Sequence, residues 1–150
     1  MTPMAQAHRT ELDISFKHCD PAGIVFYPRY VEMVNDVVEH WFKNGLSCDF
    51  ATLHGPRAMA IPVVKLQMDF RSPGFLGETL EAELGVVRLG KSSLGLRVAL
   101  RRQGAGGADA LKLVADLTLV FVDIGSKRPV EIPSDLRAAA GRYLCDGSND

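Results

Sequence analysis

The sequence has few cysteines, little net charge and no long apolar run, and each shortage excludes a class of protein. Its three cysteines in 150 residues have no CxxC spacing, so they can assemble neither a disulfide framework nor a zinc site, and we expect no metal. The 17 basic and 18 acidic residues nearly cancel, so the chain lacks the positive field that holds nucleic acid. No run approaches the roughly 18 apolar residues that cross a bilayer, and residues 1–8 lack the apolar stretch of a signal peptide. These absences predict a cytoplasmic protein that binds neither nucleic acid nor membrane.

The apolar content of the chain is sufficient for one core. Hydrophobic residues make up 47% of the sequence and charged residues 23%, which is typical of a folded globular protein. A length of 150 residues matches one domain, and no repeat, low-complexity tract or long linker divides it. We therefore expect a single domain over residues 1–150.

Hydrophobic periodicity predicts an α+β architecture. Residues 10–17 alternate between apolar and polar, which indicates a strand. Residues 28–44 have apolar positions at helical spacing, with a proline at the start and a glycine after the end, and predict one long helix that is covered on most sides. A weaker pattern favours a short helix between Leu46 and Gly55, and another helix begins at Pro133. Four further segments alternate with a period of two and predict consecutive antiparallel neighbours in a sheet that wraps the long helix. These segments are 64–70, 80–86, 94–100 and 111–121.

The segment from Gly85 to Ser92 matches the P-loop pattern GxxxxGK[ST] letter for letter. A P-loop leads into a helix whose N-terminal amides bind phosphate, whereas the residues after Ser92 alternate like a strand. We therefore interpret the segment as a hairpin turn and not as a nucleotide-hydrolase site. The turn is either simply solvated or a binding site for phosphate groups. The second alternative is open because lysine and arginine donate charge-assisted hydrogen bonds to phosphate. The candidate residues for phosphate binding are Arg88, Gly90, Lys91, Ser92 and Ser93.

The most informative stretch lies between the first strand and the long helix. By its composition alone it is an ordinary turn, because aspartate before proline with a glycine nearby is common in turns. The residues from Asp20 to Pro28, Asp-Pro-Ala-Gly-Ile-Val-Phe-Tyr-Pro, nevertheless resemble the Asp-Pro-Ala-Gly-Ile-Val-aromatic-Tyr-Pro signature of the 4-hydroxybenzoyl-CoA thioesterase family. The order of strand, signature, long helix and four strands also fits the hot-dog fold of these enzymes, over about residues 9–144. The resemblance implies an antiparallel sheet wrapped around one central helix, and an enzyme that hydrolyses acyl-CoA thioesters.

The resemblance assigns catalytic roles to two positions. Asp20 corresponds to the family's catalytic carboxylate, which acts as nucleophile or general base, and Tyr27 to the residue whose backbone N–H polarises the thioester carbonyl. Both roles agree with elementary chemistry, because a helix N-terminus offers free N–H groups to a developing oxyanion and a carboxylate can attack a carbonyl or deprotonate water. The resemblance implies no cofactor beyond the coenzyme A of the substrate. It implies a homodimer or homotetramer with active sites at the interface, and edge strands need cover in any case.

Residues around the signature are candidates for holding the acyl group. Tyr27 points to the aryl-CoA branch of the family, and Phe26 and Tyr30 add rings that suit a flat acyl group. Two positions depart from the aryl enzymes: Asn35 replaces a helix aspartate, and Ile61 replaces a polar residue, which removes groups that recognise a 4-hydroxyl. The alternatives are a short- or medium-chain acyl-CoA thioesterase and a non-catalytic protein that binds CoA esters. The candidate substrate-binding residues are His18, Gly23, Ile24, Phe26, Tyr30, Asn35, Ile61 and Val63.

Overall fold

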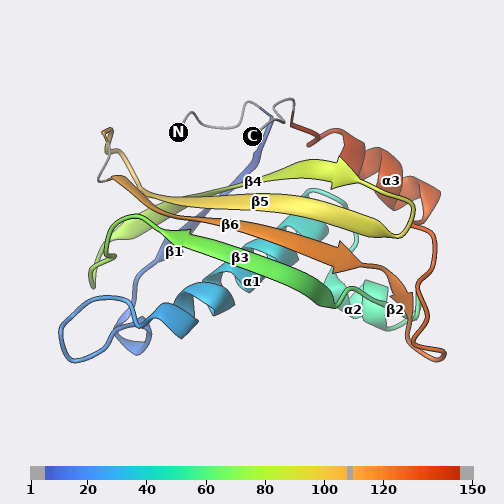
Figure 1. Cartoon of the computed structure of the whole chain (residues 1–150), viewed down its shortest axis with the longest axis horizontal. Coiled ribbons are helices and arrows are strands. Elements are labelled where there is room, and N and C mark those ends of the chain that lie inside the picture. The colour runs from blue at the N-terminus through green and yellow to red at the C-terminus, as the bar shows by residue number, and fades with distance from the viewer. Residues whose placement is uncertain (1–5, 108–109, 146–150) are drawn as a thin grey trace.

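The computed structural model describes residues 6–107 and 110–145, in which an antiparallel sheet curves over one long helix (Figure 1). The sheet has five strands in the order β1-β4-β5-β6-β3, and a second, two-stranded sheet pairs β2 with β7. No helix in the described ranges combines the length and the apolar character needed to span a membrane. The strands are β1 (His8–Asp13), β2 (Met59–Ala60), β3 (Val63–Phe70), β4 (Thr79–Leu89), β5 (Ser93–Arg102), β6 (Leu111–Val120) and β7 (Val122–Asp123). The helices are α1 (Tyr27–Asn44), α2 (Phe50–His54) and α3 (Ser134–Gly141), with a 3-10 turn η1 at Phe16–His18.

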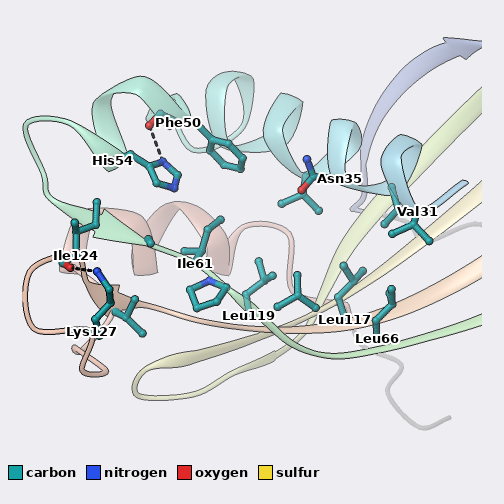
Figure 2. Close-up of a pocket in the computed structure, with 16 residues that line it drawn as sticks. Val31, Asn35, Phe50, His54, Ile61, Leu66, Leu117, Leu119, Ile124 and Lys127 are labelled. Carbon is teal, nitrogen blue, oxygen red and sulfur yellow. Dashed lines mark hydrogen bonds between the residues drawn. The ribbon is translucent and has the colours of Figure 1, made fainter. Parts of the chain in front are cut away.

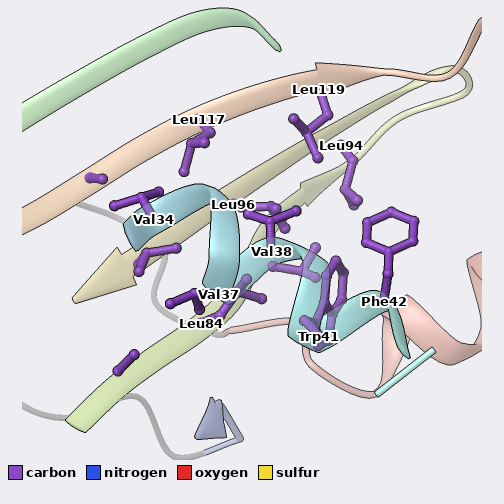
Figure 3. Close-up of a cluster of buried hydrophobic side chains, with 14 of the residues drawn as sticks. Val34, Val37, Val38, Trp41, Phe42, Leu84, Leu94, Leu96, Leu117 and Leu119 are labelled. Atoms are coloured by element: carbon purple, nitrogen blue, oxygen red, sulfur yellow. The ribbon is translucent and has the colours of Figure 1, made fainter. Parts of the chain in front are cut away.

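The core lies between α1 and the concave face of the sheet (Figure 3). Trp41 and Phe42, near the end of α1, are both 0% exposed, and their rings meet edge to face with centroids 5.4 Å apart. Burying an aromatic side chain of this size stabilises the fold by roughly 1.5–3 kcal/mol. The helix is covered on one side and not on most sides, as Val31 on its open side is 40% exposed. The side chains that meet in this core include Val34, Val37 and Val38 of α1 and Leu84, Leu94, Leu96, Leu117 and Leu119 of the sheet.

The sequence correctly predicts the meander of β4, β5 and β6 but not the place of β3. β3 pairs with β6 at the far edge of the sheet, and β4 pairs with β1. The expectation that all four later strands are consecutive neighbours is therefore wrong. Residues 71–78 do not form a tight hairpin, because they pack against the loop before α1, where the Val25 N–H donates to the Gly74 carbonyl at 2.9 Å.

The first strand ends earlier than its alternating pattern suggests. β1 ends at Asp13, and the chain then turns into η1, because the Ser15 N–H donates to His18 Nδ1 at 2.8 Å. Ile14 is still buried, but Phe16 is 83% exposed. The predicted strand over 10–17 is therefore wrong for its last residues.

The P-loop match is a β-hairpin, as expected from the strand pattern after it. Leu89 at the end of β4 pairs with Leu94 of β5, and the intervening residues make the turn. No helix follows Ser92 that could present amides to a phosphate, because the chain continues directly as β5.

Candidate active site

Asp20 lies at the start of a tight loop whose shape its own carboxylate helps to fix. Asp20 Oδ1 accepts a hydrogen bond from the Ala22 N–H at 2.9 Å, and the Asp20 carbonyl accepts one from the Gly23 N–H at 2.9 Å. Gly23 has a φ of 82°, which favours glycine at this position. Within the described ranges Oδ2 has no hydrogen-bond partner. The loop thus presents a half-buried carboxylate with one oxygen available to a substrate.

The N-terminus of α1 supplies an unpaired amide close to this loop in the sequence. Tyr27 is the first residue of α1, and the first N–H groups of a helix have no partner within it. Pro28 follows and has no N–H, while the Arg29 N–H donates to the Phe26 carbonyl at 2.8 Å. Among the residues that the structure describes, the Tyr27 N–H has no hydrogen-bond acceptor, and it lies at the positive end of the helix dipole. An anionic oxygen that develops on a bound thioester would be stabilised by such a donor.

Two other segments hold the loop in place. An isolated antiparallel bridge between Cys19 and Val25 closes it, and the Leu76 N–H donates to the Gly23 carbonyl at 3.1 Å. His18 takes part through its backbone, because its carbonyl accepts the Phe26 N–H at 2.9 Å. Its ring nitrogen Nδ1 accepts a bond from the Ser15 backbone. Burial, with the nearby charges of lysine and arginine side chains, lowers the pKa of His18, which favours the neutral ring that this bond requires.

A cavity of about 610 Å³ runs along the open side of α1, between this helix, α2 and strands β3 and β6 (Figure 2). Three of the predicted substrate-binding residues line it: Asn35, Ile61 and Val63. Its walls are almost entirely aliphatic, and the sequence analysis did not identify the walls from α2 and β6, because only the folded chain brings these elements together. The lining residues that it missed include Phe50, His54, Leu66, Leu117, Leu119 and Lys127.

The remaining predicted acyl-binding residues lie around the loop and not in that cavity. Tyr30 is 3% exposed and belongs to the core, whereas Phe26 is 49% exposed beside the ring of Tyr27. A second, open cavity of about 750 Å³ includes His18 and shares Val31 and Asn35 with the first. Asn35 therefore lies between the cavity that includes His18 and the aliphatic cavity beside α1. Gly23 and Ile24 are half-buried parts of the loop itself.

The predicted phosphate-binding turn lies at the other end of the sheet from the Asp20 loop (Figure 1). Backbone groups of this turn already form hydrogen bonds within the chain. The Gly90 N–H donates to the Ser93 carbonyl at 2.8 Å, and Arg137 donates to the Gly90 and Lys91 carbonyls at 2.6 and 3.2 Å. Arg88 donates to Ser93 Oγ at 3.0 Å. The side chains of Arg88 and Lys91 are exposed, and Ser92 and Ser93 are half-buried. Within one chain, the structure does not bring this turn to Asp20.

Comparisons with known proteins identify the family. Residues 14–140 match the model of the thioesterase-like superfamily. The chain is 28% identical over 135 residues to 4-hydroxybenzoyl-CoA thioesterase of Pseudomonas sp. (strain CBS-3), covering 88% of this chain and 96% of that protein. Among solved structures, an Asp→Asn mutant of 4-hydroxybenzoyl-CoA thioesterase, complexed with 4-hydroxybenzoyl-CoA, superposes with a TM-score of 0.81 at 24% identity, over 91% of this chain and 99% of that one. A 1,4-dihydroxy-2-naphthoyl-CoA thioesterase from Synechocystis also has a TM-score of 0.81, at 16% identity over 90% and 96% of the two chains. The α+β hot-dog fold predicted from the sequence is thus confirmed, and the chain belongs to the thioesterase-like superfamily as a thioesterase.

Proposed function

We propose that this thioesterase hydrolyses aromatic acyl-CoA esters to the free acid and coenzyme A. In this proposal, Asp20 either attacks the thioester carbonyl carbon or removes a proton from the water that attacks it. The C–S bond then breaks, and the sulfur leaves as the thiol of coenzyme A after protonation. Where Asp20 is the nucleophile, the acyl group remains on its carboxylate as a mixed anhydride, and a water molecule then hydrolyses this anhydride to release the free acid. The Tyr27 N–H donates to the carbonyl oxygen while it carries negative charge.

The observation that carries the proposal is the arrangement of Asp20 and Tyr27 in one short loop. The loop holds a carboxylate with an unpaired oxygen at one end and a free helix N-terminal N–H at the other. These are the two groups that hydrolysis of a thioester requires: one to supply or activate the nucleophile and one to stabilise the oxyanion. The names of the relatives support a CoA ester with an aromatic acyl group as the substrate.

We further propose that the active enzyme contains at least two copies of the chain, joined at β3. β3 is an edge strand eight residues long that exposes apolar side chains, with Val64 at 60% and Leu66 at 40%. An exposed apolar edge strand of this kind is a template for pairing with another strand. If two copies pair antiparallel through β3, the rotation that relates them exchanges the two ends of the sheet. The turn with Arg88 and Lys91 of one copy then lies at the same end as the Asp20 loop of the other, where it can bind the phosphates of coenzyme A.

The aliphatic cavity beside α1 favours a second candidate, a thioesterase for aliphatic acyl-CoA esters. Its walls consist mainly of valine and leucine side chains, and Asn35, His54 and Lys127 are its few polar residues. A short or medium alkyl chain would fill such a cavity without needing a polar partner. An aromatic ring would fit it as well, but it would gain no hydrogen bond to a ring hydroxyl except at those three side chains.

A thiol-release assay with benzoyl-, 4-hydroxybenzoyl-, phenylacetyl- and butyryl-CoA tests the proposal. We expect kcat/KM for the two benzoyl esters to agree within about 100-fold, because a site with few polar partners discriminates weakly for a hydroxyl. We expect both values to exceed the value for butyryl-CoA. A butyryl-CoA value above both would assign the enzyme to aliphatic esters, and binding of all four esters without turnover would contradict the proposed hydrolysis.

A further inference from the structure

Lys112 at the start of β6 is a buried charge outside the proposed catalytic groups. It is 3% exposed, and Lys112 and Glu83 are the two buried charged residues in the described part of the chain. Lysine is almost never buried without a partner, because its charge loses hydration there. Lys112 Nζ donates to the Pro73 carbonyl at 3.0 Å and lies 3.3 Å from Glu78 Oε1. It also lies 5.8 Å from the centroid of the Phe75 ring.

All of these contacts fall on residues 73–78, within the connection between β3 and β4 (71–78). Glu78 Oε1 also accepts the Phe75 N–H at 2.8 Å, so the carboxylate is hydrogen-bonded to the backbone of the same connection. Arg102 lies 3.7 Å from Glu78 Oε2, at the rim of the pair. The ammonium group therefore holds both ends of this connection, one through a backbone carbonyl and the other through a side chain.

The same connection holds the loop that carries Asp20. The Gly74 carbonyl accepts the Val25 N–H at 2.9 Å, and the Leu76 N–H donates to the Gly23 carbonyl at 3.1 Å. An isolated antiparallel bridge pairs Ile24 with Phe75. The two loops thus form a small ladder at the end of the sheet where α1 begins (Figure 1).

We propose that the buried Lys112–Glu78 ion pair is a positioning device that sets the Asp20 loop relative to the N-terminus of α1. The role of Asp20 in hydrolysis rests on the proposed function, but the positioning of the loop does not. A buried ion pair is a weak source of stability, since desolvation offsets most of its Coulomb attraction. What the pair contributes is a fixed geometry for residues 73–78, and through them for the loop. A misplacement of about 1 Å in a catalytic group can lower turnover by about 100-fold.

The test compares two double variants, each of which neutralises a partly buried carboxylate and one of its basic partners. Lys112→Met with Glu78→Gln removes both charges, keeps similar shapes and preserves an acceptor for the Phe75 N–H. The control, Arg9→Met with Glu83→Gln, removes the pair between β1 and β4, whose nitrogen and oxygen are 3.0 Å apart. Glu83 is 2% exposed and its ion pairs are with Arg9 and Arg101, not with the connection.

The first readout is amide hydrogen exchange of Val25 and Leu76, which needs no substrate. We expect exchange of both amides to accelerate by about tenfold or more in the Lys112/Glu78 variant under conditions where it is folded, and to stay near wild-type in the control. The second readout is kinetic: kcat falls by about 10- to 100-fold with KM within about threefold, while the control keeps both constants.

Exchange rates at Val25 and Leu76 that do not change, or that rise as much in the control, would overturn the positioning role. A kcat within twofold of wild-type in the Lys112/Glu78 variant would overturn it as well. If wild-type protein hydrolyses no aryl-CoA ester, the proposed function fails on its own, and the exchange measurement still decides the role of Lys112.

Discussion

Gly74 is the point where the β3–β4 connection meets α1, and Gly74→Ala tests how tightly the two are packed. A Cβ at this position would lie 2.3 Å from the Tyr30 hydroxyl and 2.9 Å from Ile14 Cδ1. The end of the Ile14 side chain can rotate away, whereas Tyr30 is 3% exposed and its ring is enclosed by the core. Overpacking of a core typically costs 1–3 kcal/mol, so we expect this variant to lose about 2 kcal/mol of unfolding free energy.

A second substitution identifies the atom responsible. The Tyr30 hydroxyl is buried beside the backbone of Gly74 but forms no hydrogen bond of good geometry within the described part of the chain, so we expect Tyr30→Phe alone to change stability by less than about 1 kcal/mol. In the double variant, the new methyl group no longer meets an oxygen. We therefore expect at least about 1 kcal/mol of the loss to be recovered, as a coupling energy in a double-mutant cycle.

Urea unfolding followed by tryptophan fluorescence measures these differences. Trp41 is the one tryptophan of the sequence and is 0% exposed, so its emission reports unfolding of the core. Gly141→Ala in α3 is the matched control, because no described atom outside its chain neighbours and its own helix backbone lies within 4 Å of its added Cβ and alanine is the better helix former. The steric argument is wrong if Gly74→Ala is as stable as this control, or if Tyr30→Phe recovers nothing.

Three further predictions concern the basic turn and two titrating groups. Lys91→Ala should raise KM for CoA esters several-fold with kcat unchanged, and the effect should shrink at high ionic strength. Steady-state kinetics at two salt concentrations check this. An unchanged KM at low salt would show that Lys91 is a solvated turn residue that does not bind phosphate. Burial lowers the pKa of His18 below 6.5, so the stability from its bond to Ser15 is present above pH 6.5 and lost as pH falls through the folded-state pKa; an NMR titration giving 6.5 or higher would refute it. Hydrogen bonds from Arg57 lower the pKa of Asp135 below 3.8, so its contribution is present above pH 3.8 and lost as pH falls further; Tm measured from about pH 5 down to pH 2 should fall less steeply in Asp135→Asn, and equal slopes would contradict the assignment.

The parts of the fold that local patterns determine were predictable from the sequence. The periodicity of residues 28–44 predicted α1 to within one residue, and the strand pattern after Ser92 was enough to reject the P-loop. The signature residues also predicted where the helix begins. Each of these features depends on neighbours within about one helical turn or one hairpin.

The parts that depend on distant packing were not predictable in the same way. The alternation in β3 suggests a buried face, yet Phe70 is 51% exposed because the strand lies at the sheet edge, beyond the cover of α1. The aliphatic cavity combines Asn35 with side chains of α2 and β6, and no sequence pattern connects these segments. The burial of Lys112 was not predictable either, since a lysine within a strand pattern is usually solvated. Its acceptor, the Pro73 carbonyl, is brought close to it by folding.

The most direct test of the account is the turnover of Asp20→Asn with 4-hydroxybenzoyl-CoA, measured beside its binding. The amide keeps the shape of the side chain and the acceptor for the Ala22 N–H, so we expect the fold, the Tm and the Kd measured by calorimetry to stay near wild-type. It neither attacks a carbonyl nor accepts a proton well, so kcat should fall by about 100- to 10,000-fold. A variant that retains more than about a tenth of the wild-type kcat would show that Asp20 is only a turn residue and that the proposed mechanism is wrong.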